Sequence, residues 1–198
     1  MTRILLCATS LAPHFAAGYR SLAAREGIEL VVLVRRPPPL TPFDPRVLLS
    51  GVDHRLLDPE EASDPHKIAR IAHDVEPTTL IIPGWGTSAY RRLATDRQLR
   101  GAQKVMNLDT QLRFTRRQWL LRQLLQVRGW LRPYDAFLVA GARGYDFLRS
   151  VHVAPERIMT GGLAYDADRF RLNLDRSASQ VAAGPTITRE PAEADEPA

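Results

Sequence analysis

The sequence predicts an α/β fold, a Rossmann-like doubly wound parallel sheet of about six to seven strands. Short apolar runs such as RILLCAT and IELVVLVRR recur with the length of strands that are buried on both faces of a parallel sheet. Segments with helical spacing of apolar residues separate these runs, and strands that alternate with helices form parallel sheets with right-handed crossovers. The 198 residues, 44% of them hydrophobic and 25% charged, suffice for one globular domain of this kind.

Apolar periodicity and capping residues define the individual elements. Ser10 can cap a helix that runs up to Gly27, and Asp64 followed by Pro65 has the pattern of a helix start. The segment 37–45 holds five prolines in nine residues and is predicted to be neither helix nor central strand. The predicted strands are 3–9, 28–36, 52–57, 78–83, 102–108, 134–141 and 156–162, and the predicted helices are 11–26, 64–75, 88–100, 112–132 and 142–151.

Residues 1–172 are predicted to form one domain, and residues 173–198 a disordered acidic tail. The segment 177–198 carries four acidic residues and one arginine, and it has almost no large apolar side chains with which to build a core. Positive charge concentrates between residues 91 and 132, where eleven Arg or Lys residues stand against two Asp. The formal net charge of +5 does not by itself indicate a class of partner.

Missing motifs exclude several functional classes. The first strand leads into TSLAPHFAAG rather than Gly-x-Gly-x-x-Gly, which argues against NAD or FAD, and the sequence contains neither a Walker motif nor His-Glu-x-x-His. The single cysteine, Cys7, excludes a disulfide framework and a cysteine-built zinc site, and its apolar surroundings favour a buried thiol. Because no apolar run approaches the roughly 20 residues of a membrane span, we expect a cytoplasmic protein.

The candidate site lies where doubly wound sheets bind ligands, outside the carboxyl ends of the strands and near the reversal of strand order. There Trp85 lies between Gly84 and Gly86, in the turn after a predicted strand, and offers a flat apolar face of the kind on which sugar rings stack. The alternative is that Trp85 only closes the edge of the sheet. The other residues at these ends are 10–14, 109–111 and 141–143.

Four stretches resemble the N-terminal half of a family 4 glycosyltransferase of the GT-B architecture. FAAGYRSLAAREGIELVVLV is similar to the first helix and second strand of the family, and PTTLIIPGWGTSAYRRL to its Asp-Val-Ile-Ile-x-Gly-Trp segment. NLDTQLRFTRRQWLLRQLL resembles its acidic-Ser/Thr turn and basic helix. The stretch from Tyr134 to Phe170 resembles the end of its N-terminal domain, which closes on Val-Asp-x-x-x-Phe, apart from Ala167.

The resemblance implies the acceptor-binding half of an enzyme that transfers sugar from an NDP-sugar to a glycan, lipid-linked or natural-product acceptor. The pair of Glu residues, seven residues apart, with which relatives hold the donor does not occur in this sequence. We therefore expect the chain alone to be inactive, without cofactor or metal, and to act with a donor-domain chain or by self-association. The alternative is a non-catalytic scaffold or regulatory protein, or a truncated remnant, with the same fold.

By the same resemblance the expected acceptor site has Trp85 as its wall and Asp109 as the candidate general base. The sequence reads Leu-Asp-Thr at this turn, where relatives often have Ser-Asp-Ser or Glu-Ser-Thr. Asp109 could instead cap the next helix, and Arg143 could be a solvated arginine rather than a phosphate ligand. The full expected set is Pro13, His14, Gly84, Trp85, Gly86, Asp109, Thr110, Gly141 and Arg143.

The segment 112–132 is predicted to be a basic helix, since residues 111–132 carry six arginines and no acid. Trp119 and Trp130 are three turns apart and are expected to share one face of it. Such a helix could be a solvated element whose tryptophans complete the core, or it could contact the inner face of an anionic membrane. Nucleic-acid binding is not expected, because no helix-turn-helix, zinc-finger or RNP pattern occurs. The apolar strip expected to pack on the sheet is Leu120, Leu124, Val127 and Leu131.

Overall fold

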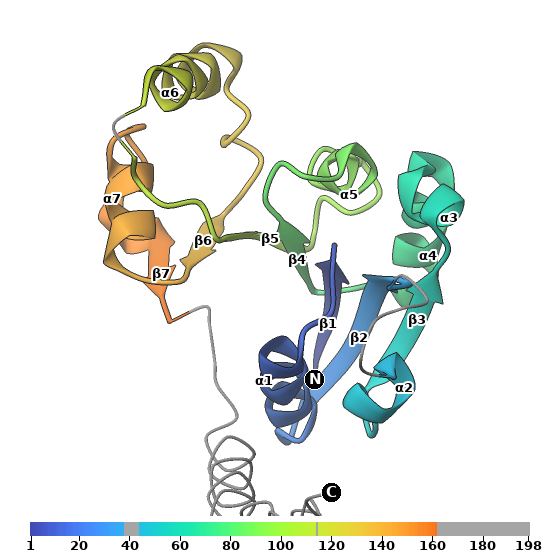
Figure 1. Cartoon of the computed structure of the whole chain (residues 1–198). Helices are drawn as coiled ribbons and strands as arrows, with labels where there is room; N and C mark the ends of the chain where they lie inside the picture. Colours follow the sequence, from blue (N-terminus) through green and yellow to red (C-terminus); the bar gives the residue numbers. More distant parts are fainter. Residues whose placement is uncertain (38–43, 114, 162–198) are drawn as a thin grey trace, which may run out of the picture. The chain divides into compact units, whose positions relative to one another are not determined.

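The computed structural model describes residues 1–37, 44–113 and 115–161. Within them, seven strands form one all-parallel sheet in the order β3-β2-β1-β4-β5-β6-β7 (Figure 1). This confirms the predicted fold class, whereas the predicted tail 173–198 and the predicted domain end at residue 172 lie outside the described residues. The strands are β1 (Thr2–Ala8), β2 (Ile28–Arg35), β3 (Asp53–Leu57), β4 (Thr79–Pro83), β5 (Gln103–Leu108), β6 (Ala136–Val139) and β7 (Ile158–Thr160).

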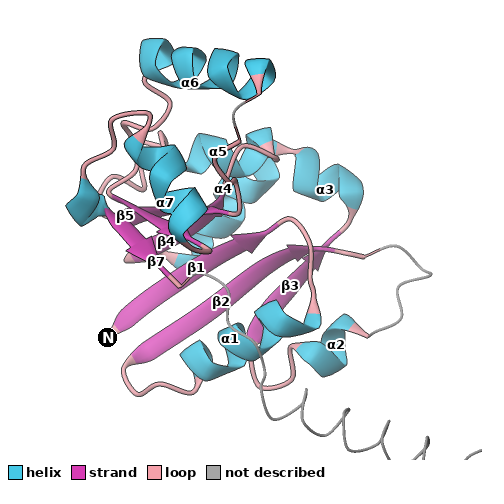
Figure 2. Cartoon of the chain, turned by 60° about the vertical axis from the view of Figure 1, so that its left-hand side comes forward, coloured by secondary structure: helices cyan, strands magenta, loops and turns pink. Residues whose placement is uncertain are grey.

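Helices cover both faces of the sheet, as a doubly wound arrangement requires (Figure 2). On one face Ala16 and Leu48 join the apolar side chains of β1 and β2. On the other face Ile68, Tyr90 and Phe147 belong to a second buried cluster. The helices are α1 (Pro13–Ala23), α2 (Pro45–Leu48), α3 (Pro59–Ser63), α4 (Pro65–Val75), α5 (Ser88–Leu93), α6 (Arg116–Arg128) and α7 (Ala142–Arg149), with a 3-10 turn at Pro155–Arg157. None of these helices has the length and apolar character needed to cross a membrane.

Strand β1 contributes to both cores, which explains why its sequence is a nearly unbroken apolar run. Ile4 and Leu6 point into the cluster beneath α1 and α2, while Leu5 and Cys7 point into the cluster beneath α4 and α5. All four side chains are at most 7% exposed. A strand buried on both faces needs apolar residues at every position rather than at alternate ones.

Capping residues explain two helix starts, one of them differently from the sequence prediction. Asp64 caps α4 as predicted, because its carboxylate accepts hydrogen bonds from two backbone amides of the first turn, at 2.8 and 3.3 Å. The prediction that Ser10 caps the first helix is wrong. That helix starts at Pro13 with Ala12 as the residue before it, since proline suits a first helical position that needs no N–H donor.

Helix α5 is shorter than predicted and ends at Leu93 instead of Arg100. The carboxylate of Asp96 accepts a hydrogen bond from the backbone N–H of Gln98 at 2.8 Å and lies 3.1 Å from the ring nitrogen of His73. Such a local side-chain contact gives the backbone an alternative to the helical hydrogen bond. The apolar spacing of this segment did not indicate that the helix ends at Leu93.

The predicted helix 112–132 is also shorter in the structure, where α6 spans Arg116–Arg128. Thr115 starts the helix by accepting a hydrogen bond from the backbone N–H of Gln118 at 3.3 Å. Gly129 ends it in the left-handed conformation, with φ 60°, which glycine adopts at low cost. Trp130 therefore lies beyond the helix, and the prediction that Trp119 and Trp130 share one helix face is wrong.

The predicted packing of the apolar strip of α6 on the sheet is also wrong. Leu131 is buried but lies after the helix, and the helix itself buries Leu125 instead. Figures 1 and 2 both show α6 set apart from the sheet. Three side chains of the strip are exposed: Leu120 by 60%, Leu124 by 36% and Val127 by 83%.

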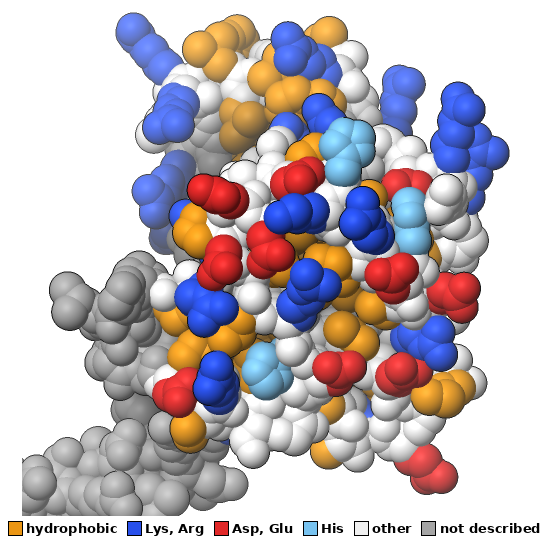
Figure 3. Space-filling model, turned by 90° about the vertical axis from the view of Figure 1, so that its right-hand side faces the viewer, with side chains coloured by type: hydrophobic (Ala, Val, Ile, Leu, Met, Phe, Trp, Pro, Cys, Tyr) orange, Lys and Arg blue, Asp and Glu red, His pale blue; other side chains and the backbone are white. Residues whose placement is uncertain are grey.

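Acidic and basic side chains are interspersed on the face beside β3 and α3, as Figure 3 shows. Arg36 pairs with Asp58 at 2.7 Å, and Arg55 lies 3.6 Å from Glu61. Exposed pairs of this kind contribute little to stability.

Candidate functional site

A cavity of about 320 Å³ opens at the carboxyl ends of β1, β4 and β5. The strand order reverses between β1 and β4, so the cavity lies where doubly wound sheets bind ligands. Its volume is at the lower end of the range of small-molecule sites, which is roughly 300–1,000 Å³. We call it the edge cavity; its lining comes from 7–10, 83–86 and 107–110, with Phe15, Tyr19 and Ala140.

Trp85 forms one wall of the edge cavity and is held from two directions. Its indole Nε1–H donates a hydrogen bond to Thr110 Oγ1 at 3.3 Å. Its ring meets Phe147 edge-on, with centroids 6.1 Å apart at 68°. The side chain is therefore fixed before any ligand arrives, which reduces the entropy lost on binding. Trp85 thus both closes the sheet edge and lines the cavity.

The glycine before Trp85 lets the turn pack closely against β5. The backbone N–H of Gly84 donates to the carbonyl of Asn107 at 2.8 Å. A Cβ at this position would lie 2.9 Å from Cδ2 of Leu108, which is closer than packed carbons approach. Gly86 is less constrained, because the nearest atom to its Cβ position is 4.0 Å away on Thr9.

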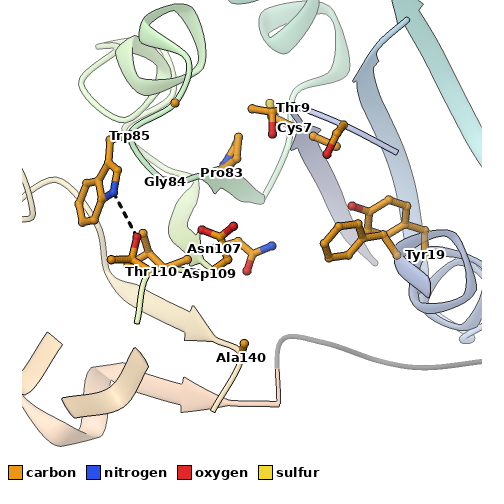
Figure 4. A pocket seen from close by; sticks show the side chains of 15 residues that line it. Cys7, Thr9, Tyr19, Pro83, Gly84, Trp85, Asn107, Asp109, Thr110 and Ala140 are labelled. Carbon is orange, nitrogen blue, oxygen red and sulfur yellow. Dashed lines mark hydrogen bonds between the residues drawn. The ribbon is translucent and has the colours of Figure 1, made fainter. Parts of the chain in front are cut away.

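The polar side of the cavity comes from the end of β5. Asn107 and Asp109 lie between Trp85 and Tyr19, as Figure 4 shows. Asp109 is exposed, and its carboxylate has no hydrogen-bond or ion-pair partner among residues 1–37, 44–113 and 115–161. It can accept hydrogen bonds from a bound ligand. The alternative that Asp109 caps the basic helix is wrong, because Thr115 has that role.

The opposite end of the cavity is aromatic and was not predicted. Phe15 and Tyr19 of α1 stack with centroids 6.5 Å apart at 11°. Burial raises the pKa of the Tyr19 hydroxyl to about 12, so it stays protonated and can donate a hydrogen bond. Their spacing of four residues places them on one face of the helix, which by itself indicates only packing against the core. The signal that could have identified them is the presence of two aromatic residues shortly after the first strand.

Cys7 lines the edge cavity but is not suited to nucleophilic chemistry. Its side chain is 3% exposed, and burial raises the pKa of the thiol to about 12 from the usual 9.0. The reactive thiolate is therefore almost absent at neutral pH. The buried thiol expected from the sequence is what the structure has.

A second hollow, of about 310 Å³, adjoins the edge cavity and shares Asp109, Thr110 and Ala140 with it. Gly141 and Arg143, at the start of α7, line this hollow rather than the edge cavity. The backbone carbonyl of Arg143 accepts a hydrogen bond from the N–H of Leu112 at 2.9 Å, which ties the two loops together. The structure thus places both predicted residues beside Asp109.

Pro13 and His14 line neither hollow. They form the first turn of α1, where the ring of His14 lies 4.2 Å from that of Phe15. Seven of the nine predicted site residues thus border the two adjoining hollows, whereas Pro13 and His14 do not. No cluster of three or more His, Cys, Asp or Glu side chains suited to a metal ion occurs in the described part of the chain.

No protein-family model and no curated protein sequence matches the chain. Among solved structures, it is similar to UDP-GlcNAc 2-epimerase from Neisseria meningitidis bound to UDP-GlcNAc. The identity is 12%, the TM-score 0.59, and the match covers 92% of this chain and 54% of the other. A glycosyltransferase from Rickettsia africae matches at 11% identity and a TM-score of 0.57, and the match covers 94% of this chain and 51% of the other. S. aureus MnaA with UDP matches at 15% identity and a TM-score of 0.56, and the match covers 81% of this chain and 43% of the other.

These matches show that the chain has a Rossmann-like fold, which it shares with part of this UDP-GlcNAc 2-epimerase and of this glycosyltransferase. At 11–15% identity the likeness is one of fold alone. The chain spans about half the length of these proteins, between 43 and 54%.

Proposed function

We propose that this Rossmann-like unit is the acceptor-binding half of a GT-B glycosyltransferase, and that a sugar or other polyhydroxylated acceptor occupies the edge cavity. One observation carries the proposal. At the reversal of strand order, the fixed indole of Trp85 and the unpartnered carboxylate of Asp109 line the same cavity (Figure 4). An apolar ring face with hydrogen-bond acceptors at its side matches a sugar, which has apolar C–H faces and hydroxyls around its rim.

The charge of the cavity favours a neutral sugar over a nucleotide. Among the described lining residues of the edge cavity there is no Arg or Lys to neutralise a diphosphate. The NDP-sugar donor is accordingly assigned to a second Rossmann-like domain, carried by the same polypeptide or by a partner chain. The assignment to family 4 rests on the four sequence stretches that resemble that family.

In this proposal Asp109 accepts a hydrogen bond from the acceptor hydroxyl and takes up its proton. The hydroxyl oxygen then forms a bond to the anomeric carbon of the donor while the bond to the nucleoside diphosphate breaks. Trp85 orients the acceptor ring, and Thr110 keeps the indole in place. The acceptor itself is a glycan, a lipid-linked sugar or a natural product.

The test is calorimetric titration of the chain with neutral glycosides and, separately, with UDP and NDP-sugars. We expect at least one glycoside to bind, and Trp85→Leu to weaken that binding by about tenfold or more, because a packed aromatic contact is lost. Trp119→Leu is the matched control; its ring is 57% exposed on α6 and lines no part of the edge cavity.

Two outcomes would contradict the proposal. One is the absence of binding by any glycoside in the panel. The other is binding of UDP or an NDP-sugar that Trp85→Leu abolishes, since it would assign the edge cavity to the nucleotide. Glycoside binding without transfer, once a donor domain is supplied, would favour the non-catalytic alternative.

A further inference from the structure

A separate cavity, of about 390 Å³, lies between α5 and the turn that follows α6. It shares no lining residue with the edge cavity. We call it the arginine pocket, because three of the residues that line it are arginines. Its lining includes Arg91, Arg92, Arg128, Trp130 and the hydroxyl residues Ser88 and Thr95.

Two of the arginines are held over one aromatic ring. The guanidinium carbon of Arg91 lies 5.0 Å from the ring centre of Trp130, and that of Arg128 lies 5.5 Å from it. Each contact is a favourable cation–π interaction. Together they bring two positive charges to within about one Debye length of each other. The ring therefore positions the guanidinium groups and places like charges close together.

No acid compensates this charge within the described structure. The guanidinium groups of Arg91, Arg92 and Arg128 make no hydrogen bond or ion pair with residues 1–37, 44–113 or 115–161, and no Asp or Glu lines the pocket. Arg36, by contrast, pairs with Asp58 at 2.7 Å. Three unpaired guanidinium groups around one hollow create a positive potential that attracts anions.

We propose that the arginine pocket binds a phosphate-bearing ligand, with the phosphate oxygens between the guanidinium groups of Arg91 and Arg128. The guanidinium fork matches phosphate oxygens with two parallel hydrogen bonds. Arg92 adds a third cation, and the hydroxyl group of Ser88 can donate a further hydrogen bond, whereas that of Thr95 already donates to the carbonyl of Arg92 at 3.2 Å. The cavity has room for more than one phosphate group, so pyrophosphate or a phosphate ester fits better than inorganic phosphate. This inference is independent of the function proposed for the edge cavity.

The experiment titrates the full chain with pyrophosphate in about 0.15 M salt, which screens weak surface attraction. Heat of binding is measured, and the indole N–H signal of Trp130 is followed by NMR. We expect saturable binding that shifts the Trp130 signal. The double variant Arg91→Gln/Arg128→Gln is expected to weaken binding by about tenfold or more, through the loss of charge-assisted hydrogen bonds.

A matched control removes the same charge outside the pocket. Arg97→Gln/Arg100→Gln changes two exposed arginines that do not line it, and less than about a twofold effect is expected. If the double variant fails to fold, as judged by circular dichroism, Arg92→Gln replaces it, because that side chain is exposed and unpaired.

A second arm distinguishes a soluble phosphate compound from a lipid headgroup, using vesicles of phosphatidylglycerol and of phosphatidylcholine. Pyrophosphate binding lost only in the pocket variant supports the proposal with a soluble ligand. Binding to phosphatidylglycerol vesicles alone, lost only in that variant, supports it with a headgroup. No binding in either arm, or equal losses in the pocket and control variants, would overturn it.

Discussion

Two tyrosine hydroxyls are buried in the core without hydrogen-bond partners among the described residues. Tyr90 and Tyr134 are each 1% exposed, and neither hydroxyl oxygen has a partner. A buried polar group without a partner destabilises the folded state by roughly 1–3 kcal/mol. Burial also raises the pKa of Tyr134 to about 12 from the usual 10.0, with a smaller opposing effect from the charge of Arg91.

We predict that Tyr134→Phe raises the melting temperature at neutral pH by about 2–4 °C, the effect of about 1 kcal/mol in a chain of this size. Between pH 10 and 12 the unfolded state loses the Tyr134 proton before the folded state does, so stability of the wild type falls as pH rises. The variant should lose less stability over this interval, as measured by urea unfolding at each pH. Tyr145→Phe, on a partly exposed ring, is the control. A lower melting temperature for Tyr134→Phe would show that its hydroxyl has a partner.

At the scale of elements, helix α6 contacts the rest of the domain through polar side chains more than through an apolar face. Arg122 donates to the carbonyl of Ser150 at 3.1 Å, and Gln126 lies 3.0 Å from a ring nitrogen of His152. Leu125 is its one leucine with a fully buried side chain. The contact of residues 112–132 with a membrane stays a prediction, and the exposed strip is the surface through which it would act.

We predict that Leu125→Ala lowers the free energy of unfolding by about 2–4 kcal/mol, because a buried side chain is removed from a packed site. Leu120→Ala makes the same chemical change on a side chain that is 60% exposed, and it should cost less than about 0.5 kcal/mol. Chemical unfolding of both variants measures the difference. Equal losses would show that the strip is buried in solution, as the sequence suggested.

The sequence predicted the strands more reliably than the helix boundaries, for a physical reason. A strand buried on both faces leaves a short, nearly unbroken apolar run that is bounded by turn residues, as β1 and β2 show. Helices α5 and α6 end at local contacts, the Asp96 turn and Gly129, that override apolar spacing. The order of strands placed Trp85 and Asp109 at one edge, but only the three-dimensional arrangement brings Phe15 and Tyr19 of α1 to the same cavity.

At the scale of the whole molecule, the reversal of strand order between β1 and β4 determines where the edge cavity opens. The chain spans about half of its structural neighbours and forms one Rossmann-like unit in its described residues, with its edge cavity at the β1–β4 switch. The arginine pocket lies elsewhere on the same unit, between α5 and the turn after α6. The edge cavity, which has no Arg or Lys in its lining, and the arginine pocket, which has no Asp or Glu, would let this unit bind two chemically different groups.

The most direct test of the central proposal, a sugar in the edge cavity, uses the three indole N–H signals of the chain. Each signal is assigned with the corresponding Trp→Phe variant and followed by NMR during titration with the glycoside that binds. Because the N–H of Trp85 is bonded to Thr110 beside the cavity, we predict that its signal shifts while those of Trp119 and Trp130 stay in place. A Trp85 signal that does not move at saturating glycoside would contradict the proposal.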